Sequence, residues 1–345
     1  MPARSVRTSL AVAIAAALLA ACGSSSSGGT KGGTANESPA AELSSAIHAL
    51  GSAHTLDLTL SLGSSGADLL QIASGLGGDG PTKAQADAIG NDHIGVELQA
   101  APGETIRGSS TGTSTSGTAF AFTVGDDKRN YLTFESVGGS LYAQIDLRYF
   151  LPLVNGAPSI KSLERQVAGA PAFVRDALAG KWISLPAATL KSFEGLASGA
   201  AGATPSASRL SELRAKLLTT LLAHLQVARA QASAPNALNV TFNLRTLISD
   251  EYAAIGPMLS SLVPSAGALP ALHATSIPDE PIHLDTTVVN GALEEVVLDA
   301  GQFDTKQRIS VPIDLNIAQH GPTITAPTSY TPIDLSSIGQ LFSGA

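Results

Sequence analysis

Residues 54–62 read His-Thr-Leu-Asp-Leu-Thr-Leu-Ser-Leu, and this stretch decides the fold class. Leucine occupies every second position from Leu56 to Leu62, and a polar residue stands between each pair. Side chains of a strand point to alternate faces, so the pattern predicts a strand with one apolar and one wet face. Such one-sided strands are typical of antiparallel sheets that bury one face against another layer.

Weaker alternation recurs on both sides of a helical middle region. Helices are expected at 38–50, at 159–179 with a break at Pro171, at 187–197 and at about 205–230. The residues around Asn290-Gly291 are typical of a hairpin. Further strands are expected at 94–98, 119–124, 130–135, 141–147, 181–185, 238–244, 282–289, 293–298 and 308–317. Strands, then helices, then strands predict an α+β fold with a mostly antiparallel sheet.

The start of the chain has the features of a bacterial lipoprotein signal peptide. Arg4 and Arg7 precede a short apolar run, and Leu19-Ala-Ala-Cys22 matches the lipobox. We therefore expect residues 1–21 to be a signal peptide and Cys22 to carry a diacylglyceryl group and a further acyl chain such as palmitate. This anchor predicts a protein held on the extracytoplasmic side of the cell membrane. Residues 22–37, rich in Gly and Ser, are expected to form a flexible tether.

Composition argues against several classes of function. Cys22 is the only cysteine, so no intramolecular disulfide can form. Without the two signal-peptide arginines, 18 Lys+Arg remain against 28 Asp+Glu, which argues against nucleic acid as a partner. The seven histidines show no i,i+3 or i,i+4 pairing, so no metal site and no cofactor are expected. The oligomeric state stays open.

One catalytic motif occurs and is interpreted as a chance match. Gly108-Ser-Ser-Thr-Gly112 fits the G-x-S-x-G pattern of hydrolases, with Ser110 as the nucleophile. That motif needs a buried strand before it and a helix after it. Because residues 108–118 are rich in Ser, Thr and Gly, a loop or a polar strand edge is expected there, and the protein is expected not to be an enzyme.

The chain resembles the LppX/LprG-type mycobacterial lipoproteins, whose fold is similar to that of the LolA and LolB lipoprotein carriers. Beyond the lipobox and tether, the resemblance rests on short motifs: Val137-Gly-Gly-Ser-Leu-Tyr142, Gly180-Lys-Trp-Ile-Ser184, Pro281 to Gly291, Leu293 to Asp299, Ile309 to Ile317, Ile324-Thr-Ala-Pro327 and Ile333-Asp-Leu335. It implies a curved, mostly antiparallel half-barrel sheet covered by helices. It also implies one LolA-like lipid-binding domain over 38–345, and the chain departs from the family by a helical insertion around 198–235.

The apolar side of this sheet is the candidate site. The resemblance implies a hydrophobic cavity that binds or carries lipid or lipoglycan cargo through its acyl chains. The alternative is a structural or protein-interaction lipoprotein, whose helices seal a closed core without a ligand. Periodicity leaves both open. The candidate lining residues are Leu56, Leu58, Leu60, Val96, Leu98, Phe120, Phe122, Val240 and Phe242.

Overall fold

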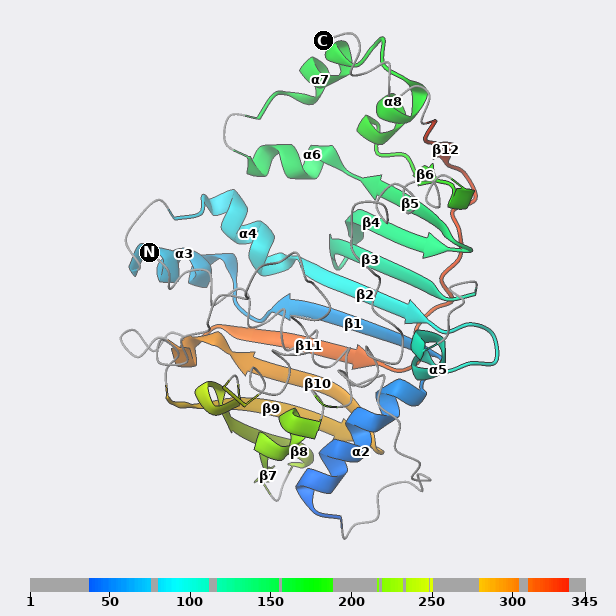
Figure 1. Cartoon of the computed structure of the whole chain (residues 1–345). Coiled ribbons are helices and arrows are strands. Elements are labelled where there is room, and N and C mark those ends of the chain that lie inside the picture. Colours follow the sequence, from blue (N-terminus) through cyan, green and yellow to red (C-terminus); the bar gives the residue numbers. More distant parts are fainter. Residues whose placement is uncertain are drawn as a thin grey trace. The chain divides into compact units, whose positions relative to one another are not determined.

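The structure is a computed structural model, and its elements are labelled in Figure 1. It describes residues 37–75, 80–111, 117–154, 157–188, 216, 219–231, 234–247, 249–250, 279–303 and 310–334. The chain divides into two compact units and passes from unit 1 to unit 2 within strand β1, after Leu56. Unit 1 comprises Met1–Leu56, Ala100–Ser114 and Ser198–His320; unit 2 comprises Asp57–Gln99, Thr115–Ala197 and Gly321–Ala345.

Unit 1 is an antiparallel sheet with a helix packed on one face. The strands follow one another in the order β11-β10-β9-β8-β7, each antiparallel to its neighbour. Their bounds are β7 Gln226–Gln231, β8 Ala234–Asn243, β9 Pro281–Val289, β10 Ala292–Asp299 and β11 Pro312–Ala318. The helices of this unit include α2 Pro39–Ser52, α5 Ile106–Thr111 and the 3-10 helix η4 Ala300–Phe303, and residues 219–224 and 244–247 are also helical.

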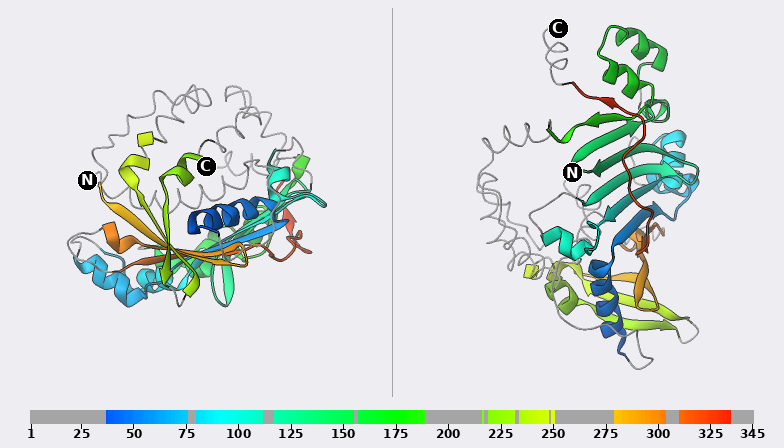
Figure 2. Two further views of the ribbon diagram at one scale, coloured as in Figure 1. Left: turned by 90° about the horizontal axis from the view of Figure 1, so that it is seen from below. Right: turned by 90° about the vertical axis from the view of Figure 1, so that its right-hand side faces the viewer.

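Helix α2 forms where its sequence predicts it. The Ser38 side chain accepts a hydrogen bond from the Ala41 N–H at 3.3 Å, and Pro39 fits the first helical turn. The helix contacts β7, β9 and β10, and it lies along the strands in the left view of Figure 2. Its apolar positions three and four residues apart are buried, namely Leu43, Ala46, Ile47 and Leu50.

Unit 2 holds a second, larger set of strands. Their order is β12-β6-β5-β4-β3-β2-β1; neighbouring strands from β2 to β6 are antiparallel, and β12 is parallel to β6. The bounds are β1 Thr55–Leu62, β2 His93–Gln99, β3 Ala119–Asp126, β4 Arg129–Val137, β5 Ser140–Ile145, β6 Ile183–Leu185 and β12 Thr331–Pro332. The helices are α3 Gly66–Gly75, α4 Lys83–Asn91, α6 Leu147–Phe150, η1 Leu151–Leu153, α7 Ile160–Gln166 and α8 Ala172–Leu178.

The predicted fold class is confirmed: the protein is α+β, with a large, open, mostly antiparallel sheet and several helices. The expected strands appear within a few residues of their predicted bounds, and Pro171 separates α7 from α8 as expected. Asn290 and Gly291 take positive φ angles of 53° and 79° in the turn between β9 and β10, as a tight hairpin requires. Pro312 opens β11, a position that tolerates proline.

Three secondary-structure predictions need correction. The helix expected over about 205–230 ends at His224, because residues 226–231 pair with β8 as strand β7. The loop expected from 108 is helical to Thr111, as part of α5. Helices α3 and α4 were not predicted. The signal peptide, Cys22, the tether as far as residue 36, and residues 189–215 lie outside the described residues, and with them most of the helix expected at 187–197 and the first part of the insertion expected around 198–235.

Candidate functional site

Strands β2 to β5 bring twelve side chains onto one face, which we call the phenylalanine face. The strand registers align them in three rows that cross the strands. These rows are Leu98-Phe120-Ser136-Leu141, Val96-Phe122-Phe134-Ala143 and Ile94-Val124-Leu132-Ile145. Eleven of these side chains are apolar, one carries a hydroxyl, and none is charged.

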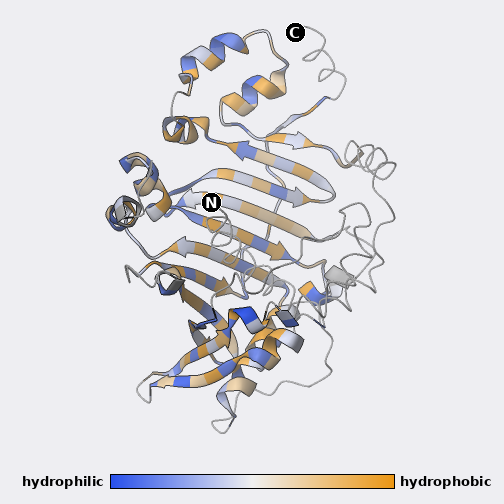
Figure 3. Ribbon diagram, turned by 60° about the vertical axis from the view of Figure 1, so that its left-hand side comes forward, coloured by the Kyte–Doolittle hydropathy of each residue, from blue (hydrophilic) through white to orange (hydrophobic). Residues whose placement is uncertain are grey.

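The phenylalanine face remains accessible although it is the apolar side of the sheet. Ile94, Phe120 and Phe134 are 39%, 37% and 36% exposed. The rings of Phe122 and Phe134 lie 6.4 Å apart, tilted by 37°, so the aromatic side chains form a contact of their own. Figure 3 shows the alternation of apolar and polar residues along the strands.

The opposite face of the same strands carries small side chains, polar side chains and the tyrosines Tyr131 and Tyr142, and most of its central positions are buried. Ala121, Thr123 and Thr133 are 4%, 8% and 7% exposed. Gly95 belongs to this face, where a Cβ would meet the Thr123 hydroxyl oxygen at 2.3 Å. In β2 to β5 the buried side chains therefore belong to this opposite face, which includes Tyr131 and Tyr142 at 5% and 7% exposure, whereas the exposed Ile94, Phe120 and Phe134 belong to the phenylalanine face.

The chain itself covers the small-residue face. We call residues 321–334 the strap. Ile324 packs against Ala119, Ala121 and Val137, and Tyr330 meets Tyr142 edge to face at 5.2 Å. In the right view of Figure 2 this segment, drawn in red, crosses the strands of unit 2. Among the described residues of β2 to β5, the large apolar side chains that stay exposed therefore lie on the phenylalanine face.

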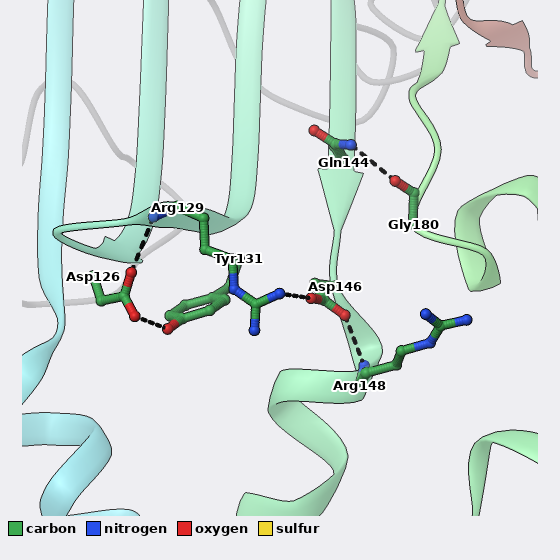
Figure 4. Close-up of polar contacts among 7 residues, drawn as sticks. All are labelled: Asp126, Arg129, Tyr131, Gln144, Asp146, Arg148 and Gly180. Atoms are coloured by element: carbon green, nitrogen blue, oxygen red, sulfur yellow. Dashed lines mark hydrogen bonds and ion pairs between the residues drawn. The ribbon is translucent and has the colours of Figure 1, made fainter.

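A polar cluster closes one end of these strands, next to the row that begins at Ile94 (Figure 4). The Tyr131 hydroxyl donates to the Asp126 carboxylate, which also accepts from the Arg129 N–H at 3.0 Å. The Arg129 guanidinium lies 5.0 Å from the Tyr131 ring centre and pairs with Asp146 at 3.3 Å. Tyr149 of α6 stacks on Tyr131, with ring centres 3.5 Å apart.

Hydrogen bonds and burial shift the pKa values of Asp126 and Tyr149 in this region. The hydrogen bond from Tyr131, together with those from the backbone of Lys128 and Arg129, lowers the pKa of Asp126. Burial, and then the hydrogen bond that Tyr149 donates to Asp92, raise the pKa of the Tyr149 hydroxyl. Because each charged group has an internal partner, we interpret the cluster as the support of α6 on the sheet.

The sequence-predicted candidates divide between the two units. Val96, Leu98, Phe120 and Phe122 lie together on the phenylalanine face as two directly paired couples. Of the three accessible residues of that face, Phe120 was predicted, and Ile94 and Phe134 were missed, although the alternation of 94–98 and 130–135 held the signal.

Strand β1 carries the predicted leucines of the opening motif. Leu56 and Leu58 are buried, and Leu60 is half-buried. In unit 2, β1 lies next to β2, and Asp57 interacts electrostatically with Glu97 and His93. Because Asp57 therefore faces the strap side, the alternating Leu58 and Leu60 point to the side of the phenylalanine face.

Val240 and Phe242 lie elsewhere, in the core of unit 1. They are 1% and 5% exposed and share a face with Leu284 and Ile282, their partners in β9. Arg229 of β7 belongs to the same face and pairs with Glu42 of α2 at 2.7 Å, so this face is the one that α2 covers. Both residues thus pack in the interior of unit 1.

A hollow of about 480 Å³ lies on the other, polar face of the sheet of unit 1. Its lining includes Asn239, Thr241, His283 and Asp285, and a His283 ring nitrogen lies 3.1 Å from the Thr241 hydroxyl. The described residues contain no cluster of His, Cys, Asp or Glu that fits a metal ion. None of the helices in the described ranges is both long enough and apolar enough to cross a bilayer.

Comparison with known proteins adds little. No family model matches the sequence, and no curated protein matches it. Among solved structures, the chain is similar to the Mycobacterium tuberculosis lipoprotein LppX, at 12% identity and a TM-score of 0.27, over 83% of this chain and 96% of that one. A TM-score this low does not support any inference about function, so the function is inferred from the chain's own residues.

Proposed function

We propose that this protein is a lipoprotein that binds acyl chains of lipids on the phenylalanine face and carries them in the cell envelope. The observation that supports it is the accessibility of Phe120 and Phe134 on an uncharged apolar face of β2 to β5, while the side chains on the opposite face are covered. A sheet that only needed a core would bury its larger apolar side chains.

The dimensions of the face suit a hydrocarbon chain. Each row of four residues crosses three strand spacings, about 14 Å, and the three rows extend about 14 Å along the strands. With no charge on the face, affinity comes from desolvation, at about 0.8 kcal/mol for each CH₂ group buried. Such a surface favours a flexible apolar ligand over a rigid polar ligand.

The proposal also includes a lipid anchor at Cys22 and assigns no catalytic role to Ser110. Acylation at Cys22 would hold the protein at the extracytoplasmic surface of the cell membrane, within reach of lipids. Ser110 belongs to helix α5, whereas a nucleophile elbow sets its serine at the turn between a strand and a helix. This placement favours a binding protein over a hydrolase.

The binding test uses the full-length protein and two kinds of ligand readout. Lipids extracted from the purified protein are identified by mass spectrometry, and a fluorescent fatty acid is titrated onto the delipidated protein. We expect co-purified acyl lipid in the wild type. We expect the affinity for the probe to fall about tenfold or more in Phe120→Asn/Phe134→Asn, since two accessible rings leave the apolar surface.

A matched control separates the face from general exposure. Ile89 in α4 is 49% exposed and lies outside the face, so Ile89→Asn should keep wild-type affinity. If the wild type yields no lipid and binds no probe, or if both variants bind alike, acyl-chain binding on this face is excluded.

The anchor has a separate test. Cells that produce the protein are labelled with radioactive palmitate. Label should enter the wild type and be absent from Cys22→Ser. Label retained in Cys22→Ser would exclude acylation at that residue without touching the binding proposal.

A closed-core interaction lipoprotein is the second candidate, and unit 1 favours it. There the same alternation is covered by α2, with Leu238, Val240 and Val288 at most 1% exposed. Under this alternative the phenylalanine face would bind neither natural lipid nor probe.

A further inference from the structure

The strap is attached to the sheet of unit 2 at both ends. The Ile324 N–H donates to the Gln99 side chain at 2.8 Å on β2. At the other end, the Thr331 and Ile333 N–H groups donate to the carbonyls of Trp182 and Ser184, at 2.9 and 2.7 Å. The Thr331 hydroxyl also donates to Asp176 of α8 at 2.7 Å. The strap thus crosses from β2 to β6 as a segment outside the sheet, and segments of this kind can open locally.

Two carboxyl groups lie on the strap face beside Ala121, where Ile324 of the strap packs. The strand registers place Glu97 and Glu135 on either side of Ala121, all three on the strap face. Ile324 packs on Ala121, so the strap passes over the space between the two side chains. One Glu135 carboxyl oxygen is buried and has no hydrogen-bond partner among the described residues.

The surroundings supply little positive charge to balance them. Asp57 on β1 faces Glu97, and His93 on β2 acts on Asp57. Arg129, at the far end of β4, pairs with Asp146. The residues that β3, β5 and β6 contribute in the same row are Ala121, Tyr142 and Ser184. The strap itself carries one charged residue, Asp334 at its end. At that end Asp176 of α8 accepts from the Thr331 hydroxyl and pairs with Lys181, which together lower its pKa, so this carboxyl group is ionised at both pH values of the test below.

We propose that the strap is a pH-controlled device, held closed over the sheet when Glu97 and Glu135 carry protons and loosened when both are ionised. With the strap closed, an unpartnered carboxylate oxygen is kept from water, which is costly for a charge and far less costly for a protonated acid. Opening the strap returns both groups to solvent.

The direction of the pH effect follows from the shifts. Burial raises the pKa of both Glu97 and Glu135, and Asp57 and Glu97 respectively add repulsion. The closed strap is therefore most stable below the ordinary pKa of Glu, about 4.3. That stability is lost as the pH rises from there through the raised pKa values, because the open state releases protons first.

Amide hydrogen exchange of the full-length protein tests the proposal. Protection factors, each relative to the intrinsic rate at the same pH, are measured for Ile324, Thr331 and Ile333 at about pH 5 and about pH 8. We expect higher protection at the lower pH, by roughly tenfold for each unit of combined pKa shift. The Ala300 N–H, which donates to the Val311 carbonyl in unit 1, is the internal reference.

The variants separate the two glutamates from general acid effects. Glu97→Gln/Glu135→Gln should keep the strap equally protected at both pH values, and Glu135→Gln alone should reduce the difference. Glu164→Gln, on the exposed surface of α7, should behave as wild type. Acrylamide quenching of Trp182, the only tryptophan and a partner of the strap, reports opening in the same samples.

Two outcomes would overturn the proposal. One is a wild-type strap whose protection does not depend on pH. The other is a pH dependence that survives in the double variant, since the controlling group would then lie elsewhere.

Discussion

The sheet under α2 in unit 1 and the β2–β5 strands in unit 2 have the same alternating pattern and opposite burial. In unit 1 the large side chains Leu238, Leu293 and Val288 are at most 1% exposed. In unit 2 Phe120 and Phe134 are accessible, and the small residues opposite them lie under the strap. Alternation thus tells which residues share a face, and the segment that packs on the strands decides which face becomes core.

The largest loss of stability is expected from a substitution in the covered core of unit 1. Leu238→Ala removes a fully buried side chain beneath α2 and should lower the free energy of unfolding by about 2–5 kcal/mol. Urea denaturation followed by circular dichroism measures it. Ile89→Ala at an exposed position of α4 is the control and should cost under about 0.5 kcal/mol. Equal losses in the two variants would mean that unit 1 has no tightly packed core.

A substitution on the phenylalanine face of unit 2 should lower the free energy of unfolding much less. Phe120→Ala removes a side chain that is 37% exposed, so the free energy of unfolding should fall by about 1 kcal/mol, less than for Leu238→Ala. The same denaturation experiment measures it, in the presence and absence of a fatty acid. Added fatty acid should stabilise the wild type more than the variant, because only ligand bound to the folded state shifts the equilibrium. A loss as large as that of Leu238→Ala would make Phe120 a core residue.

Much of the fold was predictable because its signals are local. The leucines of 56–62 and the turn residues of Asn290-Gly291 indicate strands and a hairpin without any knowledge of the rest of the chain. The turn at 125–127 is a local signal of the same kind, because it sets the register of β3 against β4 and so places Phe122 beside Phe134. The grouping of Val96 with Phe122 followed from the alternation within each strand, since the connection from β2 to β3 is longer.

The rest depends on contacts between segments that are distant in sequence. Residues 226–231, Gln-Val-Ala-Arg-Ala-Gln, favour a helix by composition and become strand β7 because they pair with β8. The strap has no periodic pattern, so its place over Ala121 was not predictable. For the same reason the sequence grouped Val240 and Phe242 with the phenylalanine face, although α2 buries them in unit 1.

A smaller effect is expected from the ion pair that joins α2 to the edge of its sheet. Glu42 lies 2.7 Å from Arg229 of β7, and its side chain is 18% exposed. Glu42→Gln should lower the free energy of unfolding by about 1 kcal/mol or less, with a smaller difference at high salt because the pair is partly open to solvent. Denaturation at two salt concentrations checks this, and Glu164→Gln on exposed α7 is the control. A loss several times larger would mean that Arg229, left without Glu42, is effectively buried.

The smallest effect is expected at the polar cluster that supports α6 at one end of strands β2 to β5. The hydrogen bond from Tyr131 is the largest cause that lowers the pKa of Asp126. Tyr131→Phe should therefore move that pKa up toward the ordinary value of about 3.9. Carboxyl-carbon NMR titration measures it, with Tyr142→Phe, outside the cluster, as the control.

The sign for stability follows from that shift. A lowered pKa in the folded state gives stability that is complete above the ordinary pKa and lost as the pH falls through the lowered one. Tyr131→Phe should therefore make the wild-type loss of stability on acidification shallower, in the range below about pH 4. An unchanged Asp126 titration in the variant would assign the shift to the backbone N–H groups of Lys128 and Arg129, which also bind this carboxylate. In that case the turn between β3 and β4, and not the tyrosine, would hold the charge at this end of the phenylalanine face.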